Sequence, residues 1–272
     1  MTLIANSRMY NATPRVKAGW DRIFAFVGER SETALEIVDH AAPAPLETLW
    51  RRPDIGCVFM CGWPFAMADT KPRIVCAPVP RPPRYGGMPV YVTDFVVRAD
   101  STATTLEDTF GGRLAWTVDH SHSGYNAARH HLLRWRTDAR PRLFAESVGP
   151  LFAPRAVIAA ILDGRADVGP VDGWYLDLLR HNDPSAVADL RVVATTAAAP
   201  APPLVAHAGM AEAELERLRS AFLDIPRQRS LEPVLETILI REFVVPEARA
   251  YDSTLAWARE AAQAGVGAMT DL

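Results

Sequence analysis

The sequence lacks the features that mark several large classes of protein. Its 272 residues include only three cysteines, an odd number with no paired framework, so we expect reduced thiols. No apolar run approaches the roughly 20 residues that span a bilayer. A net charge of −3 provides no basic field for nucleic acid or anionic lipid. We therefore expect no nucleic-acid partner and no insertion into a membrane.

Signatures of metal binding and nucleophilic catalysis are also weak. Cys57 and Cys61 form a C-x3-C pair within the apolar run IGCVFMCGW, and no further ligands accompany them in the sequence. The nucleophile motif G-x-S-x-G is absent. The basic run RWRTDARPR at 134–142 is interrupted by acidic and uncharged residues, which favours a solvated face over a polyanion-binding patch. We expect no metal and no cofactor.

The chain instead alternates strand patterns with helix patterns. Hydrophobic residues make up 49% and charged residues 22%, as in ordinary globular proteins. The apolar spacing predicts strands at 3–10, 35–40, 55–63, 71–79, 90–100, 112–119, 141–147, 166–173 and 190–196. It predicts helices at 16–30, 45–54, 105–112, 123–135, 153–164, 211–225, 231–240 and 253–264. The strand at 55–63 is apolar on both faces, which indicates a parallel sheet covered by helices.

This order of elements predicts two lobes, one inserted into the other. Residues 1–92 and 197–272 form lobe I, and residues 93–196 hold a second β-α-β series that forms lobe II. The long strands at 90–100 and 190–196 cross between the lobes as a two-strand hinge. Two α/β lobes joined in this way form a cleft that can close on a ligand.

The stretch VDHSHSG lies where a predicted strand ends and a helix begins. A helix start offers unpaired N–H groups and a partial positive charge, and serine is a favoured cap. Ser121, Ser123 and the N–H groups of Ser123 to Tyr125 are therefore candidates for binding an oxyanion, with Gly124 allowing close approach. Three alternatives remain at this point: an ordinary N-cap, a catalytic serine with a histidine base, and a zinc site formed by His120 and His122 with His130 and His131.

The pattern strand–D-x-S-x-S-G–helix resembles the phosphonate-binding family of ABC-transporter solute receptors. Flanking segments extend the resemblance over most of the chain: FVVRADSTATTLEDTFGGRLAW precedes the turn, AVIAAILDGRADVGPVDG follows it, SRMYNATP and FMCGWPFA lie near the start, and RVVATT returns. The resemblance implies an α/β fold of the type 2 periplasmic-binding-protein class. In that fold each lobe is a mixed sheet flanked by helices, and a two-strand hinge joins the lobes.

The resemblance also implies which residues contact the ligand. Ser121, His122, Ser123 and Gly124 match the Ser/Thr-rich turn that holds phosphonate oxygens in the family, and Tyr125 follows them. Tyr10 and Trp63 match positions that line the cleft, although both could simply pack at a lobe edge. Asp172 closes a strand on the far wall, or it caps the following helix.

Two features depart from the family pattern. Arg155 stands where aminophosphonate binders carry a carboxylate for the substrate amine, which favours an anion without an amine, unless Arg155 is exposed and has no ligand role. The chain also shows no secretory leader, so we expect a periplasmic protein if a leader was removed and a cytoplasmic protein otherwise.

These observations predict a solute-binding protein that closes on a small oxyanion and performs no chemistry. Its expected partners are a small anionic ligand and an ABC permease. The alternative is a cytoplasmic enzyme on the same scaffold that acts on a cofactor precursor, with His122 as the acid/base group and Asp172 as its partner or as a substrate anchor. The effector domain of a larger regulator is a third class, but its usual DNA-binding helices are missing.

Overall fold

The computed structural model describes residues 2–272, which divide into two compact units. Unit 1 contains the chain up to Val90 together with Pro200–Tyr251, and unit 2 contains Tyr91–Ala199 and Asp252–Leu272. The units differ from the predicted lobes mainly in residues 252–272, which the prediction placed with the outer lobe and which lie with the inserted one. The chain therefore passes between the units three times rather than twice.

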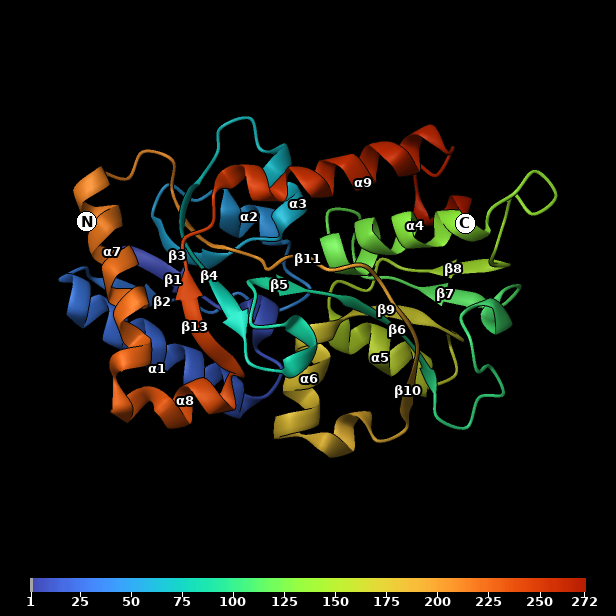
Figure 1. The fold of residues 1–272 in the computed structure, drawn as a ribbon, viewed down its shortest axis with the longest axis horizontal. Helices are drawn as coiled ribbons and strands as arrows, with labels where there is room; N and C mark the ends of the chain where they lie inside the picture. Colours follow the sequence, from blue (N-terminus) through green and yellow to red (C-terminus); the bar gives the residue numbers. More distant parts are fainter. Residues whose placement is uncertain (1) are drawn as a thin grey trace. The chain divides into compact units, whose positions relative to one another are not determined.

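Unit 1 is built on a six-stranded mixed sheet with the order β13-β4-β12-β3-β1-β2 (Figure 1). The strands are β1 Leu3–Asn6, β2 Leu35–Ile37, β3 Ile55–Phe59, β4 Arg73–Pro80, β12 Leu204–Ala206 and β13 Ile240–Val244. β1 pairs in parallel with β2 and with β3, whereas β12 and β13 run antiparallel to their neighbours. The prediction of a parallel arrangement around β3 is thus correct on the β1 side only.

The helices of unit 1 cover this sheet. They are α1 Pro14–Ser31, α2 Leu46–Trp50, α3 Gly62–Met67, α7 Glu212–Asp224 and α8 Glu232–Thr237. α1 begins where Thr13 Oγ1 accepts a hydrogen bond from the Val16 N–H, with proline at the first helical position. Trp20 of α1 is fully buried and packs edge-on against Phe59 of β3, with ring centroids 4.9 Å apart.

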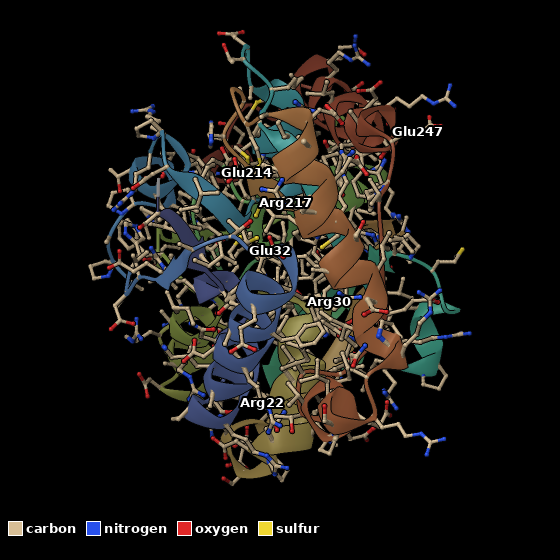
Figure 2. The ribbon with its side chains drawn as sticks, turned by 90° about the vertical axis from the view of Figure 1, so that its left-hand side faces the viewer. Arg22, Arg30, Glu32, Glu214, Arg217 and Glu247 are labelled. Atoms are coloured by element: carbon tan, nitrogen blue, oxygen red, sulfur yellow. The ribbon has the colours of Figure 1, made fainter. Side chains whose placement is uncertain are left out.

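Figure 2 shows α1 and α7 side by side, with charged side chains along their outer faces. Arg217 Nε donates to the Ser31 carbonyl oxygen at 3.0 Å, and Arg30 pairs with Asp224 at 3.2 Å. These contacts join the end of α1 to α7. Exposed ion pairs contribute little free energy, so apolar burial remains the main force that holds the two helices together.

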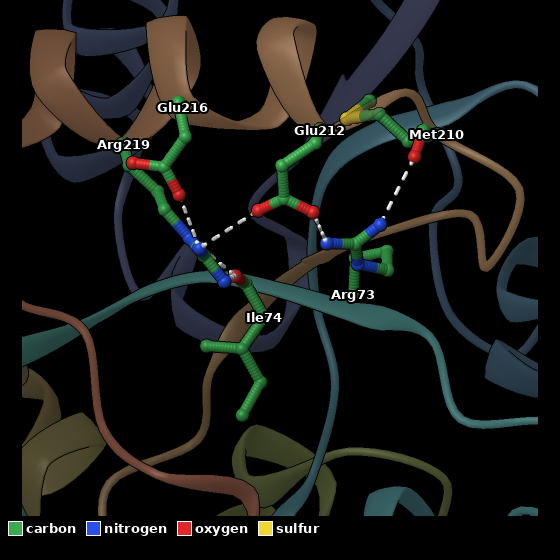
Figure 3. Close-up of polar contacts among 6 residues, drawn as sticks. All are labelled: Arg73, Ile74, Met210, Glu212, Glu216 and Arg219. Carbon is green, nitrogen blue, oxygen red and sulfur yellow. Dashed lines mark hydrogen bonds and ion pairs between the residues drawn. The ribbon is translucent and has the colours of Figure 1, made fainter.

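A second polar network joins α7 to the edge of β4 (Figure 3). Arg219 donates from Nε and Nη2 to the Ile74 carbonyl oxygen at 3.1 and 2.8 Å. Its Nη1 also contacts Glu216 and Glu212, and Glu212 in turn pairs with Arg73. The planar guanidinium group thus satisfies a backbone carbonyl and two carboxylates at once.

Unit 2 contains a three-stranded antiparallel sheet, β10-β6-β9, and a parallel pair, β7-β8. The strands are β6 Thr93–Arg98, β7 Arg113–Ala115, β8 Glu146–Val148, β9 Gly169–Asp172 and β10 Leu190–Thr195. The helices are α4 Ala127–Leu132, α5 Pro154–Leu162, α6 Gly173–Asn182 and α9 Asp252–Gln263. α9, from the end of the chain, packs along α4 (Figure 1). The short strands β5 Val90–Tyr91 and β11 Ala199–Pro200 pair where the chain passes between the units.

Several predicted elements change identity in the structure. The predicted strand at 3–10 ends at Asn6 and is followed by a 3-10 turn, and the strand at 55–63 ends at Phe59, before α3. The helix predicted at 231–240 ends at Thr237, because Leu239 adopts a left-handed φ of 53° and the strand β13 follows. No helix in residues 2–272 combines the length and the apolar character needed to cross a membrane.

Candidate functional site

The predicted binding turn forms the first turn of a helix in unit 2. Ser121 caps this helix, since its Oγ accepts a hydrogen bond from the Gly124 N–H at 3.0 Å. The next residues, His122–Asn126, form a π-turn in which the Asn126 N–H donates to the Ser121 carbonyl oxygen at 3.0 Å. π-turns are rare and occur often at functional sites. The N-cap that the sequence left as an alternative is therefore present, and it occupies the Ser121 hydroxyl and the Gly124 amide.

Other donors of this turn have no internal acceptor. The backbone N–H groups of His122 and Ser123 make no hydrogen bond to any residue from 2 to 272, nor does the Ser123 hydroxyl. The Ser123 carbonyl oxygen, by contrast, accepts from Thr93 Oγ1 at 3.1 Å, which ties the turn to β6. Unpaired N–H groups at a helix start, next to a free hydroxyl, are suited to an anion.

Gly124 is required by packing within unit 2. A Cβ atom at this position would lie 2.1 Å from Thr117 Oγ1 and 2.9 Å from Thr117 Cγ2. The segment after β7 therefore lies against the start of the helix, and any side chain at position 124 would collide with it. Packing against Thr117 thus requires glycine at position 124 independently of any ligand.

His122 is a buried and neutral histidine. Its side chain is 1% exposed, and its Nδ1 lies 3.1 Å from Asn126 Nδ2. The ring stacks on Trp257 of α9 at a centroid distance of 5.3 Å. Burial, with a smaller contribution from the nearby His130, lowers the pKa of His122 to about 3. The imidazole is therefore uncharged at neutral pH.

Tyr125 faces the end of the chain. Its hydroxyl group donates to the Gly267 carbonyl oxygen at 3.3 Å, and the guanidinium of Arg129 lies over its ring at 4.3 Å. Burial raises the pKa of this hydroxyl group. Arg129 also donates to the carbonyl oxygens of Val266 and Gly267, so the segment after α9 is fastened to the helix that begins at the binding turn.

Asp172 and Arg155 lie on neighbouring elements of the same unit. Asp172 caps α6, as one reading of the sequence predicted, because its Oδ1 accepts from the Tyr175 N–H at 3.0 Å. Arg155 is exposed at the start of α5 and lies close to the Tyr175 hydroxyl group. Tyr175 thus connects both residues. No hydrogen bond joins His122 to Asp172 in the described chain, although the enzyme alternative paired these two residues.

Tyr10 and Trp63 belong to unit 1. Tyr10 is 1% exposed and packs edge-on against Phe59, with ring centroids 5.0 Å apart. Trp63 is buried at the start of α3, four residues after the end of β3. Both aromatic residues follow strands of the unit 1 sheet, as the sequence predicted.

Sequence reasoning missed three residues around the turn: Thr117, Asn126 and Trp257. Asn126 had a usable signal, since it lies four residues after His122 on a helix, where side chains meet. Thr117 and Trp257 had none, because their contacts depend on how β7 and α9 pack against the turn.

Two further predicted features can be placed. No cluster of three or more histidine, cysteine or acidic side chains in residues 2–272 could hold a metal ion. The basic run at 134–142 contributes Arg140 and Arg142 to an open cavity of about 500 Å³, which is also lined by Phe110 and Phe144. None of the residues that line this cavity belongs to the binding turn.

Comparison with known proteins identifies the family. The sequence profile of the periplasmic substrate-binding proteins of phosphonate ABC transporters matches residues 10–251. The chain belongs to this family and is a solute-binding protein. No curated protein matches the chain.

Solved structures share the fold at low sequence identity. A binding-protein component of an ABC phosphonate transporter from Pseudomonas aeruginosa has a TM-score of 0.81 at 14% identity, covering 97% of this chain and 88% of that one. PhnD1 from Prochlorococcus marinus, in complex with methylphosphonate, has a TM-score of 0.78 at 15% identity, covering 95% and 97%. A Xanthomonas citri protein bound to ATP has a TM-score of 0.65 at 22% identity, covering 96% and 98%. The fold is therefore the two-lobed α/β fold of periplasmic binding proteins, as predicted.

Proposed function

We propose that this protein binds a small oxyanion of the phosphonate or phosphate type through the turn at residues 121–125 and performs no chemistry on it. The observation that supports this proposal is the set of donors without internal acceptors: the N–H groups of His122 and Ser123 and the Ser123 hydroxyl group. Three donors at the start of one helix match the several oxygens of a phosphonate group.

The other residues that the family resemblance assigns to the ligand are part of the same proposal. They are the aromatic residues Tyr10 and Trp63 and the polar residues Asp172 and Arg155. The positive charge of Arg155 favours a ligand without an amine, because a guanidinium group repels an ammonium group and pairs with a second anionic group. We further propose an ABC permease as partner and the periplasm as the site of action.

Isothermal titration calorimetry on the purified protein tests the ligand class. Methylphosphonate, phosphate, phosphite, 2-aminoethylphosphonate and a sulfonate are titrated separately. We expect binding of at least one phosphorus oxyanion without an amine, and weaker binding of 2-aminoethylphosphonate. Failure of every compound to bind folded protein would refute the proposed ligand class.

A serine variant tests the site. Ser123→Ala removes one donor to the anion and should weaken binding about 10-fold or more, the usual effect of one lost hydrogen bond to a charged group. Ser185→Ala is the matched control, because Ser185 is exposed and its hydroxyl group bonds only to Asp183 in the described residues. Equal affinity of the two variants would place the ligand elsewhere.

A further inference from the structure

A buried nitrogen atom beside the binding turn has no hydrogen-bond partner. His122 Nε2 is inaccessible to solvent and makes no hydrogen bond anywhere in residues 2–272. Leaving a buried polar atom unsatisfied costs about 1–3 kcal/mol, so such atoms in folded proteins nearly always have a partner. A ligand atom that reaches this nitrogen would satisfy it, and the protonation state of the ring determines whether that atom must accept or donate a hydrogen bond.

The hydrogen bonds of Asn126 define that state. Asn126 Nδ2 donates to the Thr254 carbonyl oxygen at 2.9 Å, and a carbonyl oxygen can only accept, so the amide nitrogen must face this side. The same nitrogen lies 3.1 Å from His122 Nδ1 and directs its second N–H there. Nδ1 is thus the acceptor, and a neutral imidazole then carries its proton on Nε2.

The plane of the ring is fixed by α9. Trp257 stacks on His122 at 5.3 Å and an interplanar angle of 23°, and its indole also stacks on His130 at 4.9 Å and 1°. His130 is in turn paired with Glu260 at 2.8 Å. Tyr91 of β5 lies 6.1 Å from the His122 ring. No carboxylate bonds to His122 within residues 2–272, so no neighbouring negative charge stabilises a second proton on the ring.

We infer that His122 supplies a neutral Nε2–H donor to an oxygen atom of the bound oxyanion, and that Asn126 and Trp257 are positioning residues for this donor. The inference rests on the proposed function, since it names a ligand contact of the same turn. An N–H donor pairs with an acceptor, and a deprotonated oxygen atom is a stronger acceptor than a P–OH oxygen, so the preferred ligand presents a deprotonated oxygen to this position. The last helix of the chain thereby takes part in ligand selection.

Nuclear magnetic resonance of the histidine rings tests the tautomer without any ligand. Long-range 1H–15N spectra of 15N-labelled protein should show His122 as a neutral ring protonated at Nε2, with the assignment taken from His122→Gln. Addition of methylphosphonate, or of phosphate if methylphosphonate does not bind, should shift the Nε2 resonance more than the Nδ1 resonance. A ring protonated at Nδ1, or an Nε2 resonance that ligand saturation leaves unchanged, would overturn the inference even where calorimetry confirms binding.

Substitutions of His122 test the donor. His122→Leu removes it and should weaken binding about 10- to 100-fold, whereas His122→Gln retains an N–H near Nε2 and should stay within about 3-fold of the parent protein. His130→Gln is the matched control, because His130 stacks on the same indole but is bonded to Glu260. Equal affinity of the leucine and glutamine variants would contradict the donor role, and circular dichroism verifies that both are folded.

Substitutions of the positioning residues test how the donor is held. Asn126→Asp places a carboxylate beside Nδ1 and draws the proton to that atom, so affinity should fall at high pH and recover on acidification as the ring gains a second proton. Trp257→Ala should weaken binding and broaden the His122 resonances, and Trp257→Phe should restore both. If Asn126→Asp binds with the affinity and pH dependence of the parent protein, the positioning role is wrong.

Discussion

Acid should destabilise this protein through His122. Burial lowers the pKa of this ring to about 3, whereas an unfolded chain has the ordinary value of 6.5. Between these two pKa values, His122 is therefore protonated in the unfolded state and unprotonated in the folded state. The stabilisation is complete above pH 6.5 and is lost progressively as the pH falls towards the folded pKa.

The size of the loss follows from this difference. Each pH unit below the unfolded pKa costs about 1.4 kcal/mol, so lowering the pH from about 8 to about 5 should remove about 2 kcal/mol through His122 alone. His131 adds a loss of the same sign, because burial lowers its pKa to about 4. Typical domains have a total stability of about 5–15 kcal/mol, so the effect is measurable well before acid unfolding.

Urea unfolding followed by tryptophan fluorescence measures the effect at both pH values. His122→Gln cannot take up the proton, so the free energy of unfolding should fall by about 2 kcal/mol less in this variant than in the parent protein over the same pH range. A titration of the His122 resonances should show no protonation of the folded protein between pH 7 and about pH 5. The reasoning is refuted if the variant and the parent lose equal stability, or if the folded ring titrates near its ordinary pKa.

Three other perturbations have defined outcomes. Gly124→Ala forces a methyl group onto Thr117 and should lower stability by about 1–3 kcal/mol in thermal unfolding, and Thr117→Ala in the same chain should recover part of the loss. Arg219→Leu leaves the Ile74 carbonyl oxygen and the Glu216 carboxylate without this partner, whereas Glu212 keeps Arg73, and it should cost about 1–3 kcal/mol in urea unfolding, with no loss of ligand affinity. Cys57 and Cys76 are fully buried, and burial raises the pKa of both thiols, so neither should react with iodoacetamide until the protein is unfolded; rapid alkylation of native protein would contradict their placement.

The elements that sequence reasoning predicted well are those with local signals. The helix predicted at 16–30 from apolar residues at helical spacing is confirmed as α1, which begins two residues earlier, at Pro14, after the Thr13 cap. β13 was missed because the apolar run after α8 continues the helical pattern, and the left-handed Leu239 that ends it is not a glycine. A reader of the sequence has no cue for a leucine in that conformation.

The binding turn shows the same division between local and distant information. The cap formed by Ser121 and the helix start are local, and both were predicted as possibilities. The pairing of His122 with Asn126 was accessible from their spacing of four residues. The stacking of Trp257 on His122 could not be predicted from the sequence, because the chain leaves unit 2 and returns to it between these two residues. The assignment of residues 252–272 to unit 2 escaped prediction for the same reason.

The return of residues 252–272 to unit 2 has a consequence for synthesis on the ribosome. Asn126, Arg129 and Tyr125 bond to Thr254, Val266 and Gly267, and the Leu143 and Phe144 amides bond to the Leu272 carbonyl oxygen. More than a hundred residues separate α4 from α9. During translation, the face of α4 that packs against α9 therefore stays exposed until those residues and α9 have been synthesised. In any chain that lacks residues 252–272, that face of α4 is therefore exposed to solvent.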